Sequence, residues 1–457
     1  MRNRLSQWFL LYPRVGGGLP HVTYKFIYPW LSLRHVGVVD RWYNIAADLP
    51  GVLAPPKDPD EGESRIALLT RILPSALIDQ EFTAERWVPI PEEVREVYRR
   101  VGRPTPLLRA EGFERALGTK VHIYYKYEGV LPVGSHKLNT AVAQAYYAKA
   151  DGAVEVATET GAGQWGMAVS LAAALFGLKA TVFMTRSSYN SKRQRLVFMR
   201  AYGATVYPSP SEVTETGRRH FRPDHPGSLG IAISEAVEYV LSGERRKYLP
   251  GSVMEFVLLH QTVIGLEAMR QLPEEPDYAV ACVGGGSNFG GFTYPMLGAK
   301  LRGEGFGKTK FLAVESAAAP KLTRGEYRYD FPDATGILPL IKMYTLGHDY
   351  VPPPVHAAGL RYHGAAPSLS LLKRLGHVEA VAYGQEEVME AALLFARSEG
   401  VLPAPESAHA VRAVIYLAKK LPPGSVVVFN MSGHGLLDVD AYEKALEWEK
   451  IYKHPED

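Results

Sequence analysis

A lysine lies where a predicted loop runs into an apolar-periodic helix, in the segment Pro132-Val-Gly-Ser-His136-Lys137-Leu-Asn-Thr140. The positive end of a helix dipole disfavours the charged form of a lysine, and burial there lowers its pKa further. Lys137 therefore has the setting of an imine-forming lysine, although a surface lysine without a ligand accounts for the segment equally well. His136 taken alone is more often a histidine packed in the core than a catalytic one.

A glycine-rich loop, Gly161-Ala-Gly163-Gln-Trp-Gly166, follows a predicted strand and precedes a predicted helix. Its G-x-G-x-x-G spacing occurs in dinucleotide-binding turns, but these also need an acidic residue about 20 residues later to hold the ribose. The next acidic residue after the loop is Glu212, and Glu159 lies before it. We therefore reject a nicotinamide-dependent dehydrogenase. What remains is a row of backbone N–H groups at a helix start, which binds an anion such as a carboxylate.

A second glycine cluster, Val283-Gly284-Gly285-Gly286-Ser287-Asn288, ends a strongly apolar strand. Three successive glycines let backbone amides approach a phosphate without interference from Cβ atoms. No Gly-Lys-Ser/Thr follows, so the cluster is not a nucleotide triphosphate loop. A tight structural turn is the alternative, although one or two glycines usually suffice for a turn.

Two further polar segments lie at the ends of predicted elements. Ser432 follows a strand in Asn430-Met-Ser432-Gly-His434-Gly435, where a lone serine usually caps a helix or bonds to the backbone. The segment Pro403-Ala-Pro-Glu406-Ser-Ala-His409 predicts a helix start, with Ser407 as the N-cap. Glu406 is there either a site residue or an acid that the helix dipole favours.

The elements that must position these groups alternate between short apolar runs and longer helical patterns. The predicted strands are residues 154–158, 180–184, 205–207, 278–283, 311–314 and 426–430. The predicted helices are residues 65–78, 91–101, 138–149, 166–176, 193–202, 263–271, 386–398 and 408–420. This alternation predicts an α/β fold with parallel sheets covered by helices, in which ligands bind at the carboxyl ends of strands.

The composition excludes several classes of protein. A length of 457 residues predicts two or three domains. The net charge of +3 is too small to indicate nucleic acid or a membrane surface as a partner. Cys282 is the single cysteine, which excludes an internal disulfide and favours a reducing compartment, the cytoplasm. No window is apolar for long enough to span a membrane, and residues 1–38 lack the unbroken apolar run of a signal peptide.

One cofactor accounts for all of these clusters. Pyridoxal phosphate needs a lysine for its imine, a cradle for its phosphate and a partner for its ring nitrogen. The runs that carry these residues resemble the β chains of tryptophan synthase: Gly134-Ser-His136-Lys137-Leu-Asn139-Thr140-Ala, Thr158-Glu159-Thr160-Gly161-Ala162-Gly163-Gln164 and Gly284-Gly-Gly-Ser-Asn288. The resemblance extends in order from about residue 103 to 438 through Arg103-Pro-Thr-Pro-Leu107, Leu402-Pro-Ala-Pro-Glu406-Ser-Ala-His409-Ala and Ser432-Gly-His-Gly. The departures Gly134-Ser, Trp165, Arg361-Tyr-His-Gly364 and Trp42-Tyr-Asn44 resemble the longer, second type of these chains.

The resemblance implies a role for each matching residue. Lys137 would bond to the cofactor and move the substrate's Cα proton, and Glu159 would protonate the leaving hydroxyl and accept the indole N–H proton. The residues implied to hold the cofactor are His136, Lys137, Gly284, Gly285, Gly286, Ser287, Asn288, Glu406 and Ser432. Those implied to bind the substrate carboxylate are Thr160, Gly161, Ala162, Gly163 and Gln164.

The architecture implied is the fold-type II arrangement of pyridoxal phosphate enzymes, an α/β fold with the cofactor between two domains. We expect a loose extension at residues 1–38, an N-terminal domain at 39–250 and a C-terminal domain at 251–457. A segment at about residues 152–240 would close over the substrate. The implied chain is a homodimeric lyase that makes L-tryptophan from indole and L-serine, or O-phosphoserine, with an α chain as a candidate partner. A monovalent cation held by backbone carbonyls is also implied.

Enzymes related to this family form the main alternative, because threonine synthase, serine dehydratase and cysteine synthase share the lysine and the glycine loop. The run from Glu159 to Gln164 separates them, since a carboxylate directly before the carboxylate loop provides for an indole proton. A catalytically silent scaffold protein is the other alternative. Such a protein would be expected to lose Lys137 or Glu159, and both are present.

Overall fold

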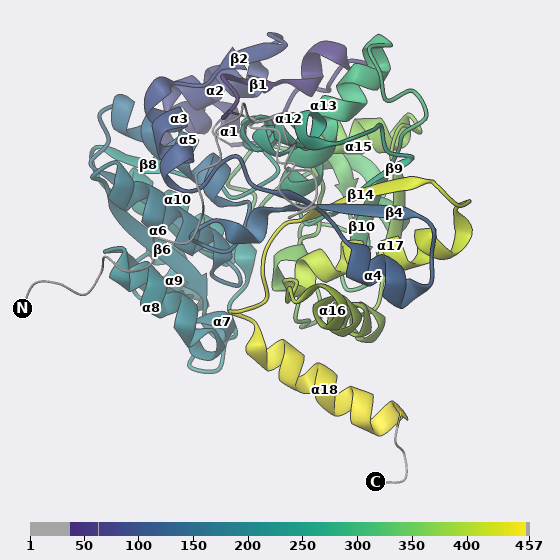
Figure 1. The fold of residues 1–457 in the computed structure, drawn as a ribbon. Coiled ribbons are helices and arrows are strands. Elements are labelled where there is room, and N and C mark those ends of the chain that lie inside the picture. Colours follow the sequence, from purple (N-terminus) through teal and green to yellow (C-terminus); the bar gives the residue numbers. More distant parts are fainter. Residues whose placement is uncertain (1–36, 63, 454–457) are drawn as a thin grey trace, which may run out of the picture. The chain divides into compact units, whose positions relative to one another are not determined.

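Two parallel sheets form the centre of the structure, a computed structural model that describes residues 37–62 and 64–453. Of the predicted N-terminal extension, residues 1–36 lie outside the described part of the chain. Figure 1 shows the smaller sheet with its helices in teal beside the larger sheet in blue, green and yellow.

The smaller sheet has four strands, and every neighbouring pair is parallel. In spatial order the strands are β7 (Thr205–Ser209), β6 (Lys179–Thr185), β5 (Glu155–Thr160) and β8 (Arg246–Tyr248). The main helices that cover it are α6 (Gln164–Leu175), α8 (Arg193–Ala201) and α10 (Leu229–Leu241). Val156 and Val182 pack with α6, whereas the neighbouring Ala157 and Phe183 pack with α10. Both faces are therefore buried, which is why these strands are continuous apolar runs.

The larger sheet has six strands, of which only the edge strand β3 is antiparallel to its neighbour. In spatial order the strands are β13 (Glu379–Tyr383), β10 (Lys310–Ser316), β9 (Tyr278–Cys282), β14 (Val426–Met431), β4 (His122–Tyr127) and β3 (Leu107–Arg109). Helix α17 (Pro405–Lys420) covers one face with Val427 and Phe429, and α13 (Ser287–Arg302) covers the other with Val428. β4 thus pairs with β14 from the second half of the chain, and β3 extends the same sheet beyond β4. The domain boundary near residue 250 stays a prediction.

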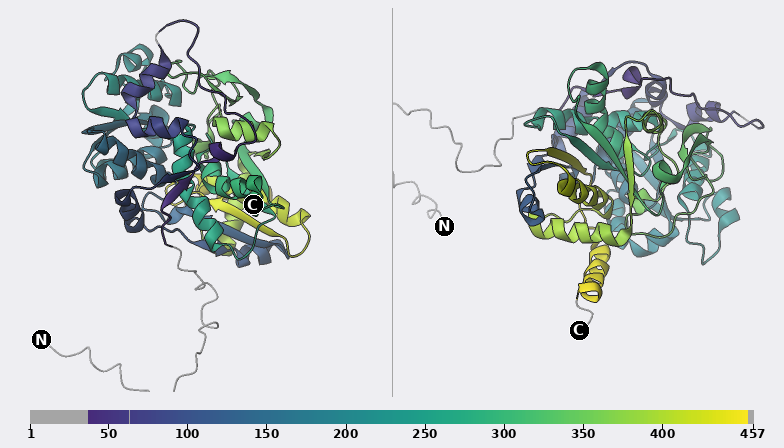
Figure 2. Two further views of the ribbon diagram at one scale, coloured as in Figure 1. Left: turned by 90° about the horizontal axis from the view of Figure 1, so that it is seen from above. Right: turned by 90° about the vertical axis from the view of Figure 1, so that its right-hand side faces the viewer.

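The remaining elements surround the two sheets. The helices are α1 (Arg65–Ile72), α2 (Ser75–Phe82), α3 (Glu92–Arg100), α4 (Glu111–Leu117), α5 (Leu138–Ala150), α7 (Arg186–Ser191), α9 (Glu215–His220), α11 (Glu255–Gln261), α12 (Val263–Gln271), α14 (Lys321–Arg324), α15 (Pro367–Arg374), α16 (Gln385–Glu399), α18 (Val439–Lys453) and the short η1 (Ile45–Asp48), η2 (Glu128–Val130) and η3 (Ala358–Leu360). Two antiparallel pairs complete the set, β1 (Arg41–Tyr43) with β2 (Trp87–Pro89) and β11 (Glu326–Asp330) with β12 (Ile341–Thr345). In Figure 2, α18 extends away from the sheets, and its Ala441 and Ala445 pack against α16.

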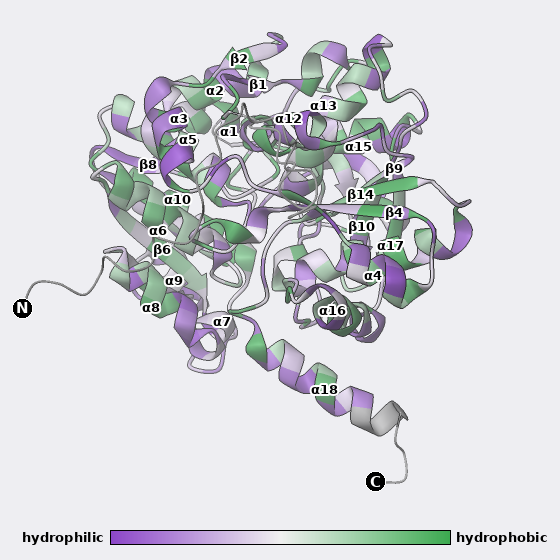
Figure 3. Cartoon of the chain, viewed as in Figure 1, coloured by the Kyte–Doolittle hydropathy of each residue, from purple (hydrophilic) through white to green (hydrophobic). Residues whose placement is uncertain are grey.

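The structure confirms the predicted strands and helices, with small shifts at their ends, except in one place. Residues 65–78 were expected to form one helix, but α1 ends at Ile72 and α2 begins at Ser75. Pro74 explains the break, because the ring of a proline forces Leu73 before it into an extended conformation. Figure 3 shows strands such as β14 largely hydrophobic and surface helices such as α3 rich in hydrophilic residues. No helix within residues 37–62 and 64–453 is long and apolar enough to cross a bilayer.

Candidate active site

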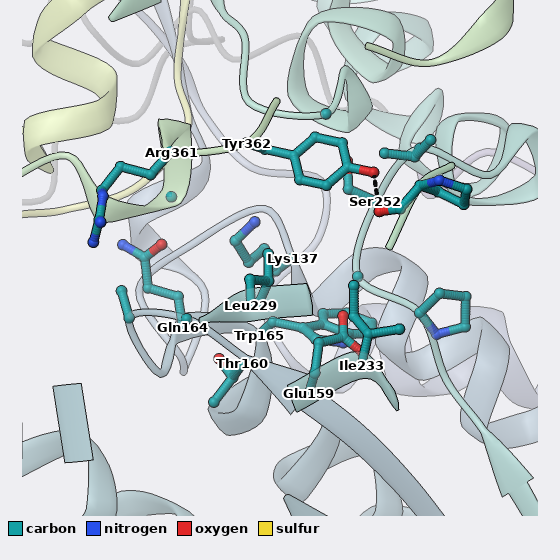
Figure 4. Close-up of a pocket in the computed structure, with 18 of the residues that line it drawn as sticks. Lys137, Glu159, Thr160, Gln164, Trp165, Leu229, Ile233, Ser252, Arg361 and Tyr362 are labelled. Atoms are coloured by element: carbon teal, nitrogen blue, oxygen red, sulfur yellow. Dashed lines mark hydrogen bonds between the residues drawn. The ribbon is translucent and has the colours of Figure 1, made fainter. Parts of the chain in front are cut away.

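The carboxyl ends of β5, β9 and β14 open on two adjoining cavities. The first contains Lys137, Glu159 and the loop that follows Glu159, and the second contains the glycine cluster and Ser432. The residues that line both cavities are Lys137, Gln164, Ser252, Gly285 and Gly359. Figure 4 shows Lys137 in the middle of the first cavity, with Glu159 on one side and Gln164 and Arg361 on another.

Lys137 is the residue immediately before α5, so its backbone joins the loop from β4 to the start of that helix. Burial lowers the pKa of Lys137, and the negative charges of Glu406 and Glu159 oppose this shift. A lowered pKa increases the fraction of neutral amine, which is the nucleophilic form of a lysine. Lys137 thus lies at the start of a helix, as its sequence position predicted, and lines both cavities.

Glu159 lies near the end of β5 with its side chain almost fully buried. Its Oε2 accepts a hydrogen bond of 2.6 Å from the hydroxyl of Tyr248, the last residue of β8. Burial raises the pKa of Glu159 to about 7, although the Tyr248 hydrogen bond and the charge of Lys137 lower it. A carboxyl group with this pKa can donate and accept a proton near neutral pH.

The side chain of Thr160, the first residue of the loop after Glu159, holds this loop in shape, and Arg195 holds it from α8. The Thr160 Oγ1 accepts hydrogen bonds from the backbone N–H groups of Gly163 at 3.1 Å and Gly166 at 3.2 Å, at the start of α6. Gly163 has a φ of 97°, in the left-handed region that favours glycine. The carbonyl of Ala162 accepts a hydrogen bond of 2.8 Å from Nη1 of Arg195.

Arg195 connects this loop to the C-terminal part of the chain. Its Nη2 donates to both carboxylate oxygens of Asp438 at 2.8 Å, and both side chains are 3% exposed. Lys192 adds a contact of 2.8 Å to Asp440, which is partly exposed at the start of α18. Asp438 follows β14 and Arg195 lies on α8, so this buried ion pair joins a helix that covers the smaller sheet to the segment after a strand of the larger sheet. No sequence motif indicated it, because the partners are far apart in the chain.

The glycine cluster forms a surface without side chains between β9 and α13. A Cβ atom added to Gly284 would lie 2.5 Å from the carbonyl oxygen of Gly359, and one added to Gly285 would collide with the Ser252 hydroxyl. Gly286 caps α13 with a φ of 121°. Gly163 and Gly286 are the two predicted site residues that line neither cavity, because each shapes the turn before a helix.

Three buried polar atoms beside the cluster have no hydrogen-bond partner in the described part of the chain: Ser135 Oγ, His136 Nε2 and Ser252 Oγ. Burial lowers the pKa of His136 to about 3, so its imidazole is neutral at physiological pH. Its Nδ1 lies 3.3 Å from the Ser432 carbonyl oxygen. All three residues line the second cavity, so this group of atoms favours a polar ligand there.

Ser432 and Asn288 have partners that the sequence did not suggest. The Ser432 Oγ lies 2.8 Å from the Ser407 Oγ, which also accepts a hydrogen bond of 3.0 Å from the Gly433 N–H. The prediction that Ser407 is an N-cap is wrong, because α17 begins at Pro405 and Ala404 precedes it. The Asn288 side chain donates to the Cys282 carbonyl at 2.9 Å and accepts from Asn430 at 2.6 Å, which leaves its backbone N–H as the group that can serve a ligand.

Glu406 is in the first turn of α17, where it joins three parts of the site. Its Oε1 accepts a hydrogen bond of 2.8 Å from the Gly359 N–H, and its Oε2 accepts one of 3.4 Å from the Gln164 side chain. Glu406 therefore lines the second cavity and is also an acid in the first turn of a helix. Its contacts with Gln164 and Gly359 together link the loop after Glu159 to the segment that carries Arg361.

Arg361 lines the first cavity and follows η3. Its Nη2 donates to the Pro352 carbonyl at 2.6 Å, while its buried Nε has no hydrogen-bond partner within the described residues. Burial lowers the pKa of Arg361, yet a guanidinium keeps its charge in proteins. In the sequence, Arg361 stands out only within a segment that resembles the second family type, and its position in the cavity comes from the structure.

Comparisons with known proteins agree with this geometry. Residues 98–433 match the family described as pyridoxal-phosphate dependent enzyme. The chain is 86% identical to the "Tryptophan synthase beta chain" of Pyrobaculum aerophilum over 90% of this chain and 100% of that one. It is 68% identical to "Tryptophan synthase beta chain 1" of Aeropyrum pernix over 90% of this chain and 98% of that one. It is 57% identical to the "Tryptophan synthase beta chain" of Pyrococcus horikoshii, with 89% and 90% covered.

Two solved structures share the fold at much lower sequence identity. An L-serine ammonia-lyase from the fungus Rhizomucor miehei aligns with a TM-score of 0.55 at 17% identity, over 75% of this chain and 97% of that one. A pyridoxal 5'-phosphate-dependent aspartate racemase aligns with a TM-score of 0.55 at 18% identity, over 76% and 98%. These two likenesses show the fold alone.

Proposed function

This chain belongs to the pyridoxal-phosphate-dependent enzymes and, within them, to the tryptophan synthase β chains, and on that premise we propose how its residues perform the reaction. The enzyme is a lyase of tryptophan biosynthesis that joins indole to L-serine with release of water. The observation that carries our assignment of roles is the presence of Lys137 and Glu159 in one cavity, beside a loop of helix-start amides.

The residues of the second cavity fit pyridoxal phosphate. A cradle that tolerates no Cβ atom at Gly284 leaves room for a phosphate against backbone N–H groups. The partnerless Ser135 Oγ and Ser252 Oγ beside it can donate hydrogen bonds to an anion. His136 can donate from Nε2 once the phosphate raises its pKa and the ring is protonated, because its Nδ1 faces the Ser432 carbonyl.

Bound pyridoxal phosphate supplies an aldehyde that condenses with amines and a ring that accepts electrons from the substrate's Cα. Lys137 would hold the cofactor and then move the Cα proton, for which its lowered pKa suits it. Ser432, oriented by Ser407, would hydrogen-bond the ring nitrogen. A neutral serine leaves that nitrogen unprotonated, which makes the ring a weaker electron acceptor and favours replacement at Cβ over transamination.

Glu159 would move two protons. In its protonated form, which burial favours up to about pH 7, it would donate to the departing hydroxyl oxygen of serine. As a carboxylate, which the Tyr248 hydrogen bond stabilises, it would accept the proton from the nitrogen of indole while C3 attacks. Residues 160–164 would bind the substrate carboxylate through backbone N–H groups at the start of α6, with Thr160 holding the loop in shape.

Arg361 supports a second donor for the same site. A guanidinium in the cavity with an unpartnered buried Nε is suited to bind a phosphate, so O-phosphoserine could replace L-serine. We propose both donors as substrates to be compared directly. In this alternative Arg361 would stabilise the departing phosphate, whereas Glu159 would have no hydroxyl to protonate.

Several features of the wider assembly are proposals based on the resemblance. We infer a homodimer in the cytoplasm, membership of the second family type, and an α chain as a partner that delivers indole. The single cysteine supports the cytoplasmic assignment. A segment at about residues 152–240 would close over the substrate, and the Arg195–Asp438 ion pair would hold it closed.

The test is an absorbance spectrum of the purified protein with pyridoxal phosphate, recorded before and after L-serine and then indole. We expect a band of the lysine-bound cofactor that changes with L-serine and returns as tryptophan forms. A band that responds to O-phosphoserine alone would change the donor and keep the fold. Formation of a keto acid at the same rate with and without indole would instead indicate a dehydratase.

A further inference from the structure

A lysine with no part in the proposed reaction is fully buried behind the glycine cluster. Lys321 is the first residue of α14, with a side chain 0% exposed. Its Nζ donates a hydrogen bond of 3.1 Å to the carbonyl oxygen of Val283, the residue directly before Gly284. The ammonium group therefore contacts the peptide bond from which the phosphate cradle begins.

Glu315, at the end of β10, supplies the opposite charge. Its Oε1 lies 3.8 Å from the Lys321 Nζ. The carboxylate also accepts hydrogen bonds from the N–H groups of Leu322 at 2.8 Å and Thr323 at 3.0 Å, so its position does not depend on the lysine. Burial lowers the pKa of Lys321 and raises that of Glu315, and the charge of each residue opposes the shift of the other.

A second buried lysine shows how a purely structural ammonium is held in this protein. The Nζ of Lys126 donates to the Thr105 carbonyl at 2.6 Å, to Glu267 at 2.8 Å and to Gln271 at 2.8 Å, which uses all three of its N–H groups. Lys321 lacks such a closed set, because its carboxylate is beyond hydrogen-bond distance and its hydrogen bond goes to the loop. The hydrogen bond of Lys321 thus goes to the Val283 carbonyl and not to its ion-pair partner Glu315.

The planarity of the peptide bond gives this contact a consequence for the cradle. The carbonyl of Val283 and the N–H of Gly284 belong to one trans peptide unit, so they point in opposite directions. A cation on the oxygen fixes the plane and increases the polarity of the N–H on the other side. That N–H belongs to the first glycine of the cradle.

We propose that Lys321 is a positioning residue that acts as a tethered monovalent cation, holding the Val283 carbonyl so that the cradle amides face the cofactor's phosphate. This inference rests on the proposed placement of pyridoxal phosphate at residues 284–286. The monovalent cation implied by the family resemblance would offer the same charge to the same kind of ligand, a backbone carbonyl. Because Lys321 already supplies it, we expect cofactor binding that does not depend on free Na⁺ or K⁺.

The experiment measures the dissociation constant of pyridoxal phosphate for the full-length apo-protein by fluorescence, in chlorides of K⁺, NH₄⁺ or tetramethylammonium at equal ionic strength. The wild type should bind equally in all three. Lys321→Met should bind pyridoxal phosphate about tenfold more weakly in tetramethylammonium, because it has lost a charge-assisted hydrogen bond. K⁺ or NH₄⁺ should restore most of the affinity. Tetramethylammonium is too large to enter the space left by the lysine head group.

Lys126→Met is the matched control, because it also removes a fully buried ammonium bonded to a carbonyl. It should lower the melting temperature without making cofactor affinity depend on the cation. If Lys321→Met does not fold, Lys321→Met combined with Glu315→Gln removes both buried charges. This double variant should bind the cofactor weakly, and cations should not rescue it because the carboxylate that attracts them is gone.

Three results would overturn the proposal: a wild type that needs K⁺ to bind the cofactor, a Lys321→Met variant with wild-type affinity in tetramethylammonium, or a double variant with wild-type affinity. Each of these results differs from the result expected if the proposed function were wrong. In that case the wild type would bind no pyridoxal phosphate with any cation.

Discussion

The hydroxyl of Tyr248 donates a 2.6 Å hydrogen bond to Oε2 of Glu159, from the neighbouring strand of the four-stranded sheet. Both side chains are buried, and burial raises the pKa of both groups. The tyrosine therefore remains a donor over the working pH range, and it stabilises the carboxylate form of Glu159. This contact balances the two protonation states that the proposed reaction uses in turn.

Replacement of Tyr248 by phenylalanine should shift the pH dependence of the first half-reaction. Without the hydroxyl the pKa of Glu159 rises above about 7. The elimination step needs protonated Glu159, so its rate falls as pH rises through this pKa, and the fall should move up by about one pH unit. Stopped-flow absorbance after mixing with L-serine, without indole, measures the rate of this step at each pH. No shift of this pH dependence, or a shift to lower pH, would contradict the role of the hydrogen bond.

Replacement of Glu159 by glutamine should change stability in a pH-dependent way. The pKa of Glu159 in the folded protein is about 7, above its ordinary value of 4.5. The protonated group therefore contributes its full stability below pH 4.5, and the wild type loses this stability as pH rises through 7. Glutamine does not titrate, so the variant should gain up to about 3 kcal/mol relative to the wild type over this interval. Melting temperatures at pH 5 and pH 8 test this. The variant should keep the cofactor band and lose most tryptophan formation.

Removal of the Arg195 side chain should affect substrate binding and stability together. Arg195→Ala leaves Asp438 buried without its main partner and frees the Ala162 carbonyl. Breaking a buried pair of this kind costs about 3 to 5 kcal/mol. The KM for L-serine should rise at least about tenfold as the carboxylate loop loosens. Lys192→Ala is the control, because it removes the contact to the more exposed Asp440 and the longer 3.4 Å contact to Asp438 but leaves the Arg195–Asp438 ion pair in place. Its KM should stay within about threefold of the wild type.

A methyl group at Gly284 should weaken cofactor binding. The added Cβ would lie 2.5 Å from the Gly359 carbonyl oxygen, so the backbone of the cradle must move. We expect the dissociation constant of pyridoxal phosphate to rise at least about tenfold, measured by equilibrium titration. Gly307→Ala has no atom within 4 Å of its new Cβ and should bind as the wild type does. Equal affinities of the two variants for pyridoxal phosphate would contradict the placement of the phosphate at this loop.

Replacement of Arg361 by methionine separates the two donors. The guanidinium can form charge-assisted hydrogen bonds with a phosphate, whereas the hydroxyl of L-serine carries no charge. The kcat/KM for O-phosphoserine should fall at least about tenfold and that for L-serine by less than about threefold. A parallel loss with both donors would instead assign Arg361 to the structure of the cavity wall.

The sequence alone determined the α/β class, the alternation of strands and helices and the short runs that carry the site. These features are local: apolar runs and periods follow from burial, and the residues of Gly161–Gly166 and Gly284–Asn288 are contiguous. The helix break at Pro74 was also readable in principle, since a proline restricts the residue before it.

Only the tertiary structure decided the contacts between distant segments. Tyr248 with Glu159, Arg195 with Asp438 and Lys321 with Val283 join residues whose separation in the chain carries no pattern. The pairing of β4 with β14 likewise places early strands in the late sheet. Such contacts arise because parallel strands bring their carboxyl ends to one edge whatever their order in the chain, and burial there makes each polar group find a partner.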